Sequence, residues 1–405
     1  MMSAVALTAI MGSASSVSAS DLEILSDIKV KGEIRTRYEN ADVKDNGIDA
    51  ANAFTARTEL AITGGLLGVD NLTATVGIST VNNFGYTNYN STQNGETTYD
   101  KIVDPQQAML SQASVDYKMG KTAFHAGRSH INLDDQRFIG TVGWRQMERS
   151  YDTLLVSDSS IKNLGLTAAY VYGYAGVGSV DTQETGSVLL HANYKVMDAL
   201  NVTAFGYLLA NIHDTYGVRV TGKVPAGPAK LSYAASYAMQ TDNSLEYGSA
   251  GGTNDIDAQY YDIALNANIK GILVGAEYEV LGQNDSNTAT APGFTTPLAT
   301  LHKFQGWADV FLGDNNADGL IDMSAKIGYT AKGMGKALVI YHKFDAETGA
   351  ATDLGSEIDA VYTNKIPGVK GLKGLVKAAF YSAGETGSLH TKDLTKYWVQ
   401  LDYKF

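Results

Sequence analysis

The sequence of 405 residues contains no cysteine and only 6 prolines. Without cysteine, disulfide bridges and thiolate-bound zinc or iron–sulfur sites are excluded. A phosphate-binding loop and a dinucleotide fingerprint are also missing, and the 7 histidines show no metal-ligand spacing. The formal net charge of −12 argues against nucleic acid as a partner. We therefore predict neither an enzyme nor a cofactor.

Long hydrophobic runs are missing as well. Beyond residue 20 no stretch approaches the roughly 18 consecutive apolar residues that a membrane-spanning helix needs. A β-barrel hides its membrane character, because only alternate residues of each strand face lipid. With 42 glycines, 24 tyrosines and a mean hydropathy of −0.12, the composition suits either a secreted β-solenoid or an outer-membrane barrel.

The first nineteen residues indicate export. Residues 3–17 are small or apolar and carry no charge, and Val17-Ser18-Ala19 places small residues where a signal peptidase cleaves. We expect a signal peptide over 1–19, followed by a single barrel domain over 20–405. An exported chain without disulfides fits this division, since a closed barrel supplies its own stability.

From residue 28 onward the dominant period is two, which is the signature of strands. Val30, Ile34 and Tyr38 fall on one face, and Arg35 and Arg37 fall on the other. Seventeen further segments read in the same way: 52–63, 69–80, 110–118, 121–128, 151–158, 164–174, 186–195, 200–210, 215–223, 229–239, 257–268, 271–281, 323–330, 337–343, 355–363, 372–382 and 395–404. The pattern predicts an all-β, transmembrane, antiparallel β-barrel of 18 strands, with 16 as the alternative.

The connections alternate in length, which orients such a barrel. Tight turns at Met119-Gly120, 196–198 and Lys270-Gly271 are typical of the periplasmic side, and long links are typical of the outside. The long links are 81–109, 129–150, 241–256, 282–322 and 383–394.

The segment 397–405 alternates fully and finishes on Phe405, as outer-membrane barrels do for recognition by the assembly machinery. We expect the outer membrane of a Gram-negative bacterium, with its lipid and lipopolysaccharide as partners.

One segment is more specific than the barrel pattern. It comprises Gly127-Arg128, residues 131–140, residues 142–146 and Tyr151-Asp152, and a second stretch covers 304–312 with Gly319, Leu320 and Asp322. Together they resemble the motifs of the alginate-export-type outer-membrane porins. The resemblance implies an eighteen-stranded, monomeric barrel with a lumen rich in Arg and Lys that passes anionic uronate polymers.

Arginine is the residue expected to select solutes, because its planar fork pairs with carboxylates and stays protonated. The predicted pore-lining residues are Arg35, Arg37, Arg57, Arg128, Arg137, Arg145 and Arg149. Asp134, Asp135 and Trp144 are expected to hold the loop of the motif inside the lumen. As an alternative, the arginines pair with acidic neighbours such as Glu33, Glu59 and Glu148 and stiffen the barrel.

A calcium site is a weaker possibility. Asp314, Asn316, Asp318 and Asp322 match the start of a calcium loop, but position twelve is Ala325 and such strings also form ordinary turns. We predict no metal.

The sequence thus predicts an outer-membrane porin, a passive channel for small hydrophilic solutes that favours anions or acidic saccharides. Three alternatives stay open. One is a general porin that is non-selective or prefers cations. Another is a plugged barrel with a structural or adhesive role. The last is a lipase with a Ser–His pair on the lipid-facing wall.

Overall fold

The computed structural model describes residues 24–248, 255–286, 292–312, 318–349, 352–384 and 391–405. Its strands are β1 (Leu25–Val43), β2 (Ala51–Leu66), β3 (Leu72–Asn82), β4 (Gln107–Met119), β5 (Thr122–Ser129), β6 (Ser150–Asp158), β7 (Leu164–Gly176), β8 (Ser179–Met197), β9 (Leu200–Leu209), β10 (His213–Ala226), β11 (Ala229–Thr241), β12 (Asp257–Ile269), β13 (Ile272–Asn284), β14 (Leu320–Ala331), β15 (Gly335–Asp345), β16 (Asp353–Lys365), β17 (Leu372–Ser382) and β18 (Leu394–Lys404). A short 3-10 helix, η1, covers Leu301–Lys303.

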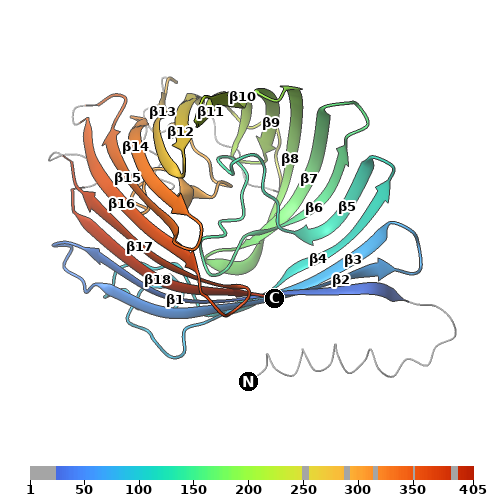
Figure 1. Ribbon diagram of the computed structural model, residues 1–405, viewed down its shortest axis with the longest axis horizontal. Coiled ribbons are helices and arrows are strands. Elements are labelled where there is room, and N and C mark those ends of the chain that lie inside the picture. The colour runs from blue at the N-terminus through green and yellow to red at the C-terminus, as the bar shows by residue number, and fades with distance from the viewer. Residues whose placement is uncertain (1–23, 249–254, 287–291, 313–317, 350–351, 385–390) are drawn as a thin grey trace.

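All the strands belong to one closed antiparallel sheet of 18 strands, as predicted (Figure 1). Each strand pairs with its neighbours in sequence, and β1 pairs with β18 from Glu33↔Lys404 to Val43↔Leu394. This seam joins the first strand to the last and leaves no free sheet edge. The predicted signal peptide, residues 1–19, lies outside the described residues.

The strand alternation separates an apolar outer wall from an inner wall that carries most of the charged side chains. In β1, Ile34 and Tyr38 are exposed, whereas Arg37 is fully buried. The same holds around the ring, where outward Leu, Val, Ile and Tyr side chains form a continuous belt. A soluble protein has the opposite arrangement, with polar side chains outside. A transmembrane barrel requires apolar side chains on its outer wall, because this wall faces hydrocarbon. Within the described residues, no helix is long and apolar enough to cross a membrane.

The predicted tight turns and long links gather at opposite ends of the barrel, here called the turn end and the loop end. β12 and β13, for example, are joined at the turn end through Lys270 and Gly271 alone. β8 starts at Ser179, seven residues before the predicted segment. The prediction missed residues 179–185 because all of them except Val180 are polar, so they show no apolar alternation. They extend a hairpin with β7 at the loop end.

Several loops fold back into the barrel, and Figure 1 shows loop 130–149 in teal within the ring of strands. Its Phe138 ring packs against Phe205 of β9 at 4.8 Å and Tyr260 of β12 at 5.4 Å, measured between ring centroids. Phe294 of loop 285–319 joins the same buried group at 6.2 Å. The apolar core of the molecule therefore lies inside the barrel, between inserted loops and the inner wall.

Candidate functional site

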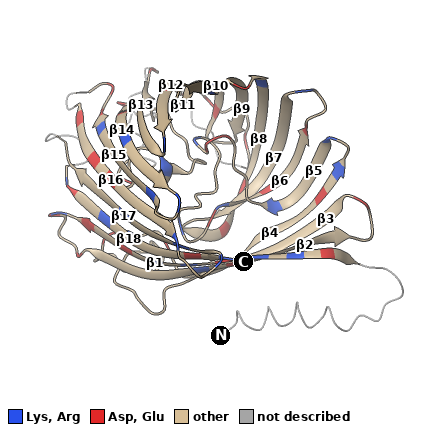
Figure 2. Cartoon of the chain, viewed as in Figure 1, with Lys and Arg blue, Asp and Glu red and all other residues tan. Residues whose placement is uncertain are grey.

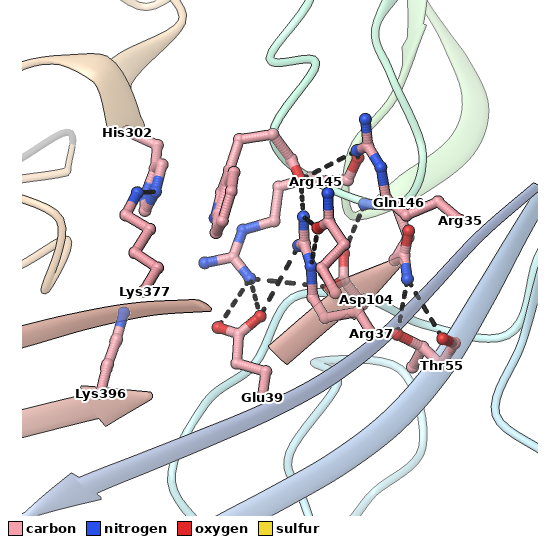
Figure 3. A network of polar contacts seen from close by, with 12 residues as sticks. Arg35, Arg37, Glu39, Thr55, Asp104, Arg145, Gln146, His302, Lys377 and Lys396 are labelled. Atoms are coloured by element: carbon pink, nitrogen blue, oxygen red, sulfur yellow. Dashed lines mark hydrogen bonds and ion pairs between the residues drawn. The ribbon is translucent and has the colours of Figure 1, made fainter. Parts of the chain in front are cut away.

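Arg145 of loop 130–149 connects three parts of the chain inside the lumen (Figure 3). Its guanidinium lies 3.2 Å from the carboxylate of Glu39 in β1, 2.8 Å from Asp309 in loop 285–319 and 3.8 Å from Asp104 in loop 83–106. Burial alone would lower the pKa of Arg145, but these carboxylates raise it above its ordinary value. The charged Arg145 side chain therefore holds loops 83–106 and 285–319 beside β1.

Arg37 and Arg35 fix the same loop from below. The Arg37 guanidinium donates to the Trp144 carbonyl at 2.6 Å and to Gln400 Oε1 at 2.8 Å, and it lies 4.1 Å from the Trp144 ring centroid. Arg35 donates to the Gly143 carbonyl at 2.8 Å and pairs with Asp402 at 2.8 Å. Both side chains therefore bind the backbone of loop 130–149 to the wall formed by β1 and β18.

The three tryptophans of the chain surround one ammonium group. Lys377 Nζ in β17 lies 4.0 Å from the ring centroid of Trp144, 3.8 Å from that of Trp307 and 5.2 Å from that of Trp398. His302 of η1 stacks on Trp144 at 4.6 Å, and its Nε2 is 2.6 Å from Lys377 Nζ. Figure 3 shows the lysine directed toward this histidine. We call Trp144, Trp307, Trp398 and Lys377 the tryptophan cage.

The other nitrogen of His302 contacts Asp309. Its Nδ1 lies 2.6 Å from Asp309 Oδ1, while Lys396 of β18 donates to Oδ2 at 3.2 Å. Burial lowers the pKa of His302 well below its ordinary value of 6.5, against the opposing charge of Asp309. Burial would raise the pKa of Asp309, but His302, Lys396 and Arg145 hold it well below its ordinary value. The neutral His302 imidazole therefore contacts the ionised Asp309 carboxylate on one side and Lys377 of the tryptophan cage on the other.

The opposite wall holds loop 130–149 through Arg137. Its Nε pairs with Glu279 of β13 at 2.6 Å, and one terminal nitrogen donates to Thr296 at 3.0 Å. The guanidinium also lies 4.7 Å from the Phe304 ring centroid. Loops 130–149 and 285–319 are thus bound to each other as well as to the strands.

The predicted loop-anchoring residues make contacts of the same kind. Asp134 lies 3.0 Å from His191 of β8, and Asp135 pairs with Arg219 of β10 at 2.6 Å. Trp144 belongs to the tryptophan cage. Arg219 is not among the residues predicted from the sequence. Its inward position follows from the alternation, because Tyr216 and Val218 face outward.

Four of the predicted pore-lining arginines are almost completely buried and paired, and Arg35, which is 9% exposed, is paired as well. Arg57 contacts Glu33 at 2.5 Å and Glu148 at 2.9 Å, and Arg37, Arg137 and Arg145 have the carboxylate contacts given above. None of the four presents a free guanidinium to the lumen, since their exposed fractions are 6% or less. Their contacts agree with the alternative expectation, in which the arginines pair with acidic residues and stiffen the barrel. The inserted loops bring carboxylates that are distant in sequence close to these arginines.

Arg128 lies on the outer wall, which corrects its prediction as a pore-lining residue. It shares a strand face with Phe124 and Ala126, both exposed, and its register partner Asp152 shares the outward face of Leu154. The guanidinium binds Asp152 in a bidentate manner, at 2.7 and 2.6 Å. The alternation alone could have placed it there.

A serine–histidine pair does occur in the barrel wall. Ser129 Oγ is 3.0 Å from His125 Nε2, and His125 Nδ1 is 2.8 Å from Asp116. His125 alternates with the outward Phe124, so the group belongs to the inner wall. The lipase alternative requires such a pair on the lipid-facing wall, and this one faces the lumen.

The described residues line a cavity at each end of the barrel. The basic vestibule, a cavity of about 900 Å³ at the turn end, is lined by Arg35, Trp144, Gln400 and Asp402 together with Lys365, Lys370, Lys373 and Lys404. The Arg149 pocket, a cavity of about 510 Å³ at the loop end, is lined by Arg149, Tyr174, Gln93, Ser179 and Asp181, among others. The lysines of the vestibule were not predicted as pore-lining residues from the sequence, although three of them cluster at 365–373.

The calcium prediction stays untested for the most part. Asp314 and Asn316 lie outside the described residues, and Asp322 accepts from His342 at 2.9 Å in the barrel wall. Among the described residues no group of three His, Cys, Asp or Glu side chains is placed to hold a metal ion.

Comparison with known proteins yields structural matches alone. No family model matches the chain, and no curated protein matches it. OpdK of Pseudomonas aeruginosa, solved with vanillate, superposes with a TM-score of 0.72 and 14% identity, over 94% of this chain and 99% of that one. OccAB2 of Acinetobacter baumannii gives 0.73 and 16%, over 94% and 98%. The chain therefore shares its fold with these proteins.

OccK9 of Pseudomonas aeruginosa, at 0.72 and 16% identity over 94% and 99% of the two chains, extends the same group. These matches do not support membership of the alginate-export-type subfamily, which the sequence motifs resemble. The motifs comprise 31 residues, most of them in loops, whereas the superposition covers 94% of the chain.

Proposed function

We propose that the chain is an outer-membrane porin, a passive diffusion channel for small hydrophilic solutes. The observation that carries the proposal is the closed barrel with an apolar outer belt and, at both ends, cavities whose linings include charged side chains. Because the outer belt faces hydrocarbon, water and solutes can cross only through the lumen of such a barrel. The fold shared with OpdK, an outer-membrane protein, supports the same reading.

We further propose a preference for anions, including acidic saccharides. In the basic vestibule, Arg35 is paired with Asp402 and Lys404 with Glu33. Lys365, Lys370 and Lys373 have no ion-pair partner among the described residues, so they leave an excess of positive charge at the turn end. Figure 2 shows acidic and basic residues interspersed over the remaining strands. A pore filters ions by the charge of its constricted parts, and vanillate, the compound solved with OpdK, is itself a carboxylate.

The test is single-channel current in a planar bilayer, with the reversal potential measured across a potassium chloride gradient. We expect a conducting, anion-selective pore, and a shift toward cations in the double variant Lys370→Glu/Lys373→Glu. Lys332→Glu, at another turn outside the vestibule, is the matched control and leaves selectivity unchanged. A cation-selective wild type would refute the anion preference and favour the general porin.

One observation favours a second function. Loops 83–106, 130–149 and 285–319 all contribute buried residues inside the barrel, and such loops can close a lumen. A plugged barrel with a structural role conducts little. Folded protein that inserts into the bilayer without measurable current would therefore support this alternative over the porin.

A further inference from the structure

Arg149 stands apart from every other arginine of the chain. Of the 8 arginines in the sequence, the other 7 form ion pairs with carboxylates. Arg149 instead donates to the carbonyl of Pro297 at 3.2 Å and to the Tyr151 hydroxyl at 3.5 Å. No carboxylate among the described residues lies within ion-pair distance of it. Within the described part of the chain, its charge therefore lacks the paired carboxylate that each of the other arginines has.

The cavity in front of Arg149 has room for a small organic molecule. Its volume of about 510 Å³ lies within the range of roughly 300–1,000 Å³ that is usual for ligand sites. Gly176 and Gly178 contribute backbone to the lining, so no side chain of theirs occupies the space. The cavity lies at the loop end, on the far side of the paired arginines from the basic vestibule.

The lining combines three kinds of contact. The Arg149 guanidinium offers a planar fork for a carboxylate. The half-buried Tyr174 ring, whose centroid lies 5.7 Å from the guanidinium carbon, offers a flat apolar face. Hydroxyl and amide groups of Thr92, Gln93 and Ser179 supply hydrogen bonds. Asp181 also lines the cavity, and its charge disfavours a ligand with a second carboxylate.

We propose that the Arg149 pocket binds the carboxylate of a monoanionic sugar acid or aromatic acid before it passes through the barrel. This inference rests on the proposed channel function and adds to it a specific site and a side of approach. The fork of Arg149 contacts the carboxylate, the Tyr174 face stacks against the body of the ligand, and the polar lining binds its hydroxyl groups. The paired arginines deeper in the lumen hold the loops that form the floor beneath the pocket.

The experiment is block of single-channel current by gluconate added to one side at a time, with glucose as the neutral control. We expect block at lower concentration from the loop end than from the turn end, and no comparable block by glucose. Arg149→Gln should weaken loop-end block at least about tenfold, as the loss of a charge-assisted hydrogen-bonded pair requires. Arg149→Lys keeps the charge without the fork, and we expect partial recovery.

Two further readouts keep the outcomes separate. Unchanged tryptophan emission in Arg149→Gln shows that the inserted loops are still docked, because all three tryptophans lie between those loops and the wall. Calorimetric binding of gluconate to the folded protein in detergent tests the pocket without current. Binding lost in Arg149→Gln without any conductance would refute the channel and keep the pocket. A conducting pore whose block is the same in wild type and Arg149→Gln would refute the pocket and keep the channel.

Discussion

Removal of Arg145 should release the inserted loops while leaving the barrel intact. In Arg145→Ala the carboxylates of Glu39, Asp104 and Asp309 stay buried without their shared cation. Breaking a buried ion pair by removing one partner costs about 3–5 kcal/mol. That free energy corresponds to a roughly 100- to 5,000-fold shift from docked to undocked loops. Of the three carboxylates that contact Arg145, only Glu39 belongs to a strand, and no strand–strand backbone hydrogen bond involves the Arg145 side chain, so the barrel should keep its closure.

The assay is single-channel conductance, combined with the heat-induced shift in gel mobility that reports the folded barrel. We expect larger and noisier conductance in Arg145→Ala, with an unchanged gel shift. Lys195→Ala is the matched control, because its partner Asp198 is almost fully exposed and a surface pair contributes little. Equal conductance in Arg145→Ala and wild type would refute the view that Arg145 holds the loops, whereas loss of the gel shift would show that it holds the barrel instead.

Three further predictions concern the same inserted loops. Because burial lowers the pKa of His302, the undocked loop binds a proton more readily than the docked one; docking is therefore strongest above about pH 6.5 and weakens as the pH falls below it. Conductance measured from pH 7.5 to 4.5 should rise toward acid, and His302→Gln should reduce that rise. Lys377→Met should shift the tryptophan emission, since all three rings face its ammonium; an unchanged spectrum would count against the cage. Gly306→Ala should loosen loop 285–319, because φ is +81° and a Cβ would lie 2.5 Å from the Glu357 carboxylate; protease cleavage of that loop at the wild-type rate would contradict this.

The strands could be predicted from sequence because their alternation is imposed by the environment. One face of each strand contacts hydrocarbon and the other faces the lumen. The alternation of apolar and polar residues within a strand therefore shows which side chains point outward. The same local signal covers Arg35 and Arg57, which lie on the inner face as predicted. It also covers Arg128, whose outward position follows from Phe124 and Ala126.

The partners of the arginines could not be predicted, because they depend on how long loops return into the barrel. Arg145 meets Asp309, and Arg137 meets Glu279, across more than 100 residues of intervening chain. No period or motif encodes these distances. That Arg149 has no carboxylate partner among the described residues could therefore be recognised only after every other pairing was known.

The seam between β1 and β18 has a consequence for the order of folding. All the other strand pairs join neighbours in sequence. The second partner of β1, in contrast, is β18, which is synthesised after all the other strands. Closing so large a loop costs more conformational entropy than closing any hairpin, and pairings of this range form slowly. Until β18 arrives, β1 presents an open edge of unpaired backbone groups that can template aggregation. Variants that weaken the seam between β1 and β18 should therefore fail during assembly, before any property of the closed barrel can be measured.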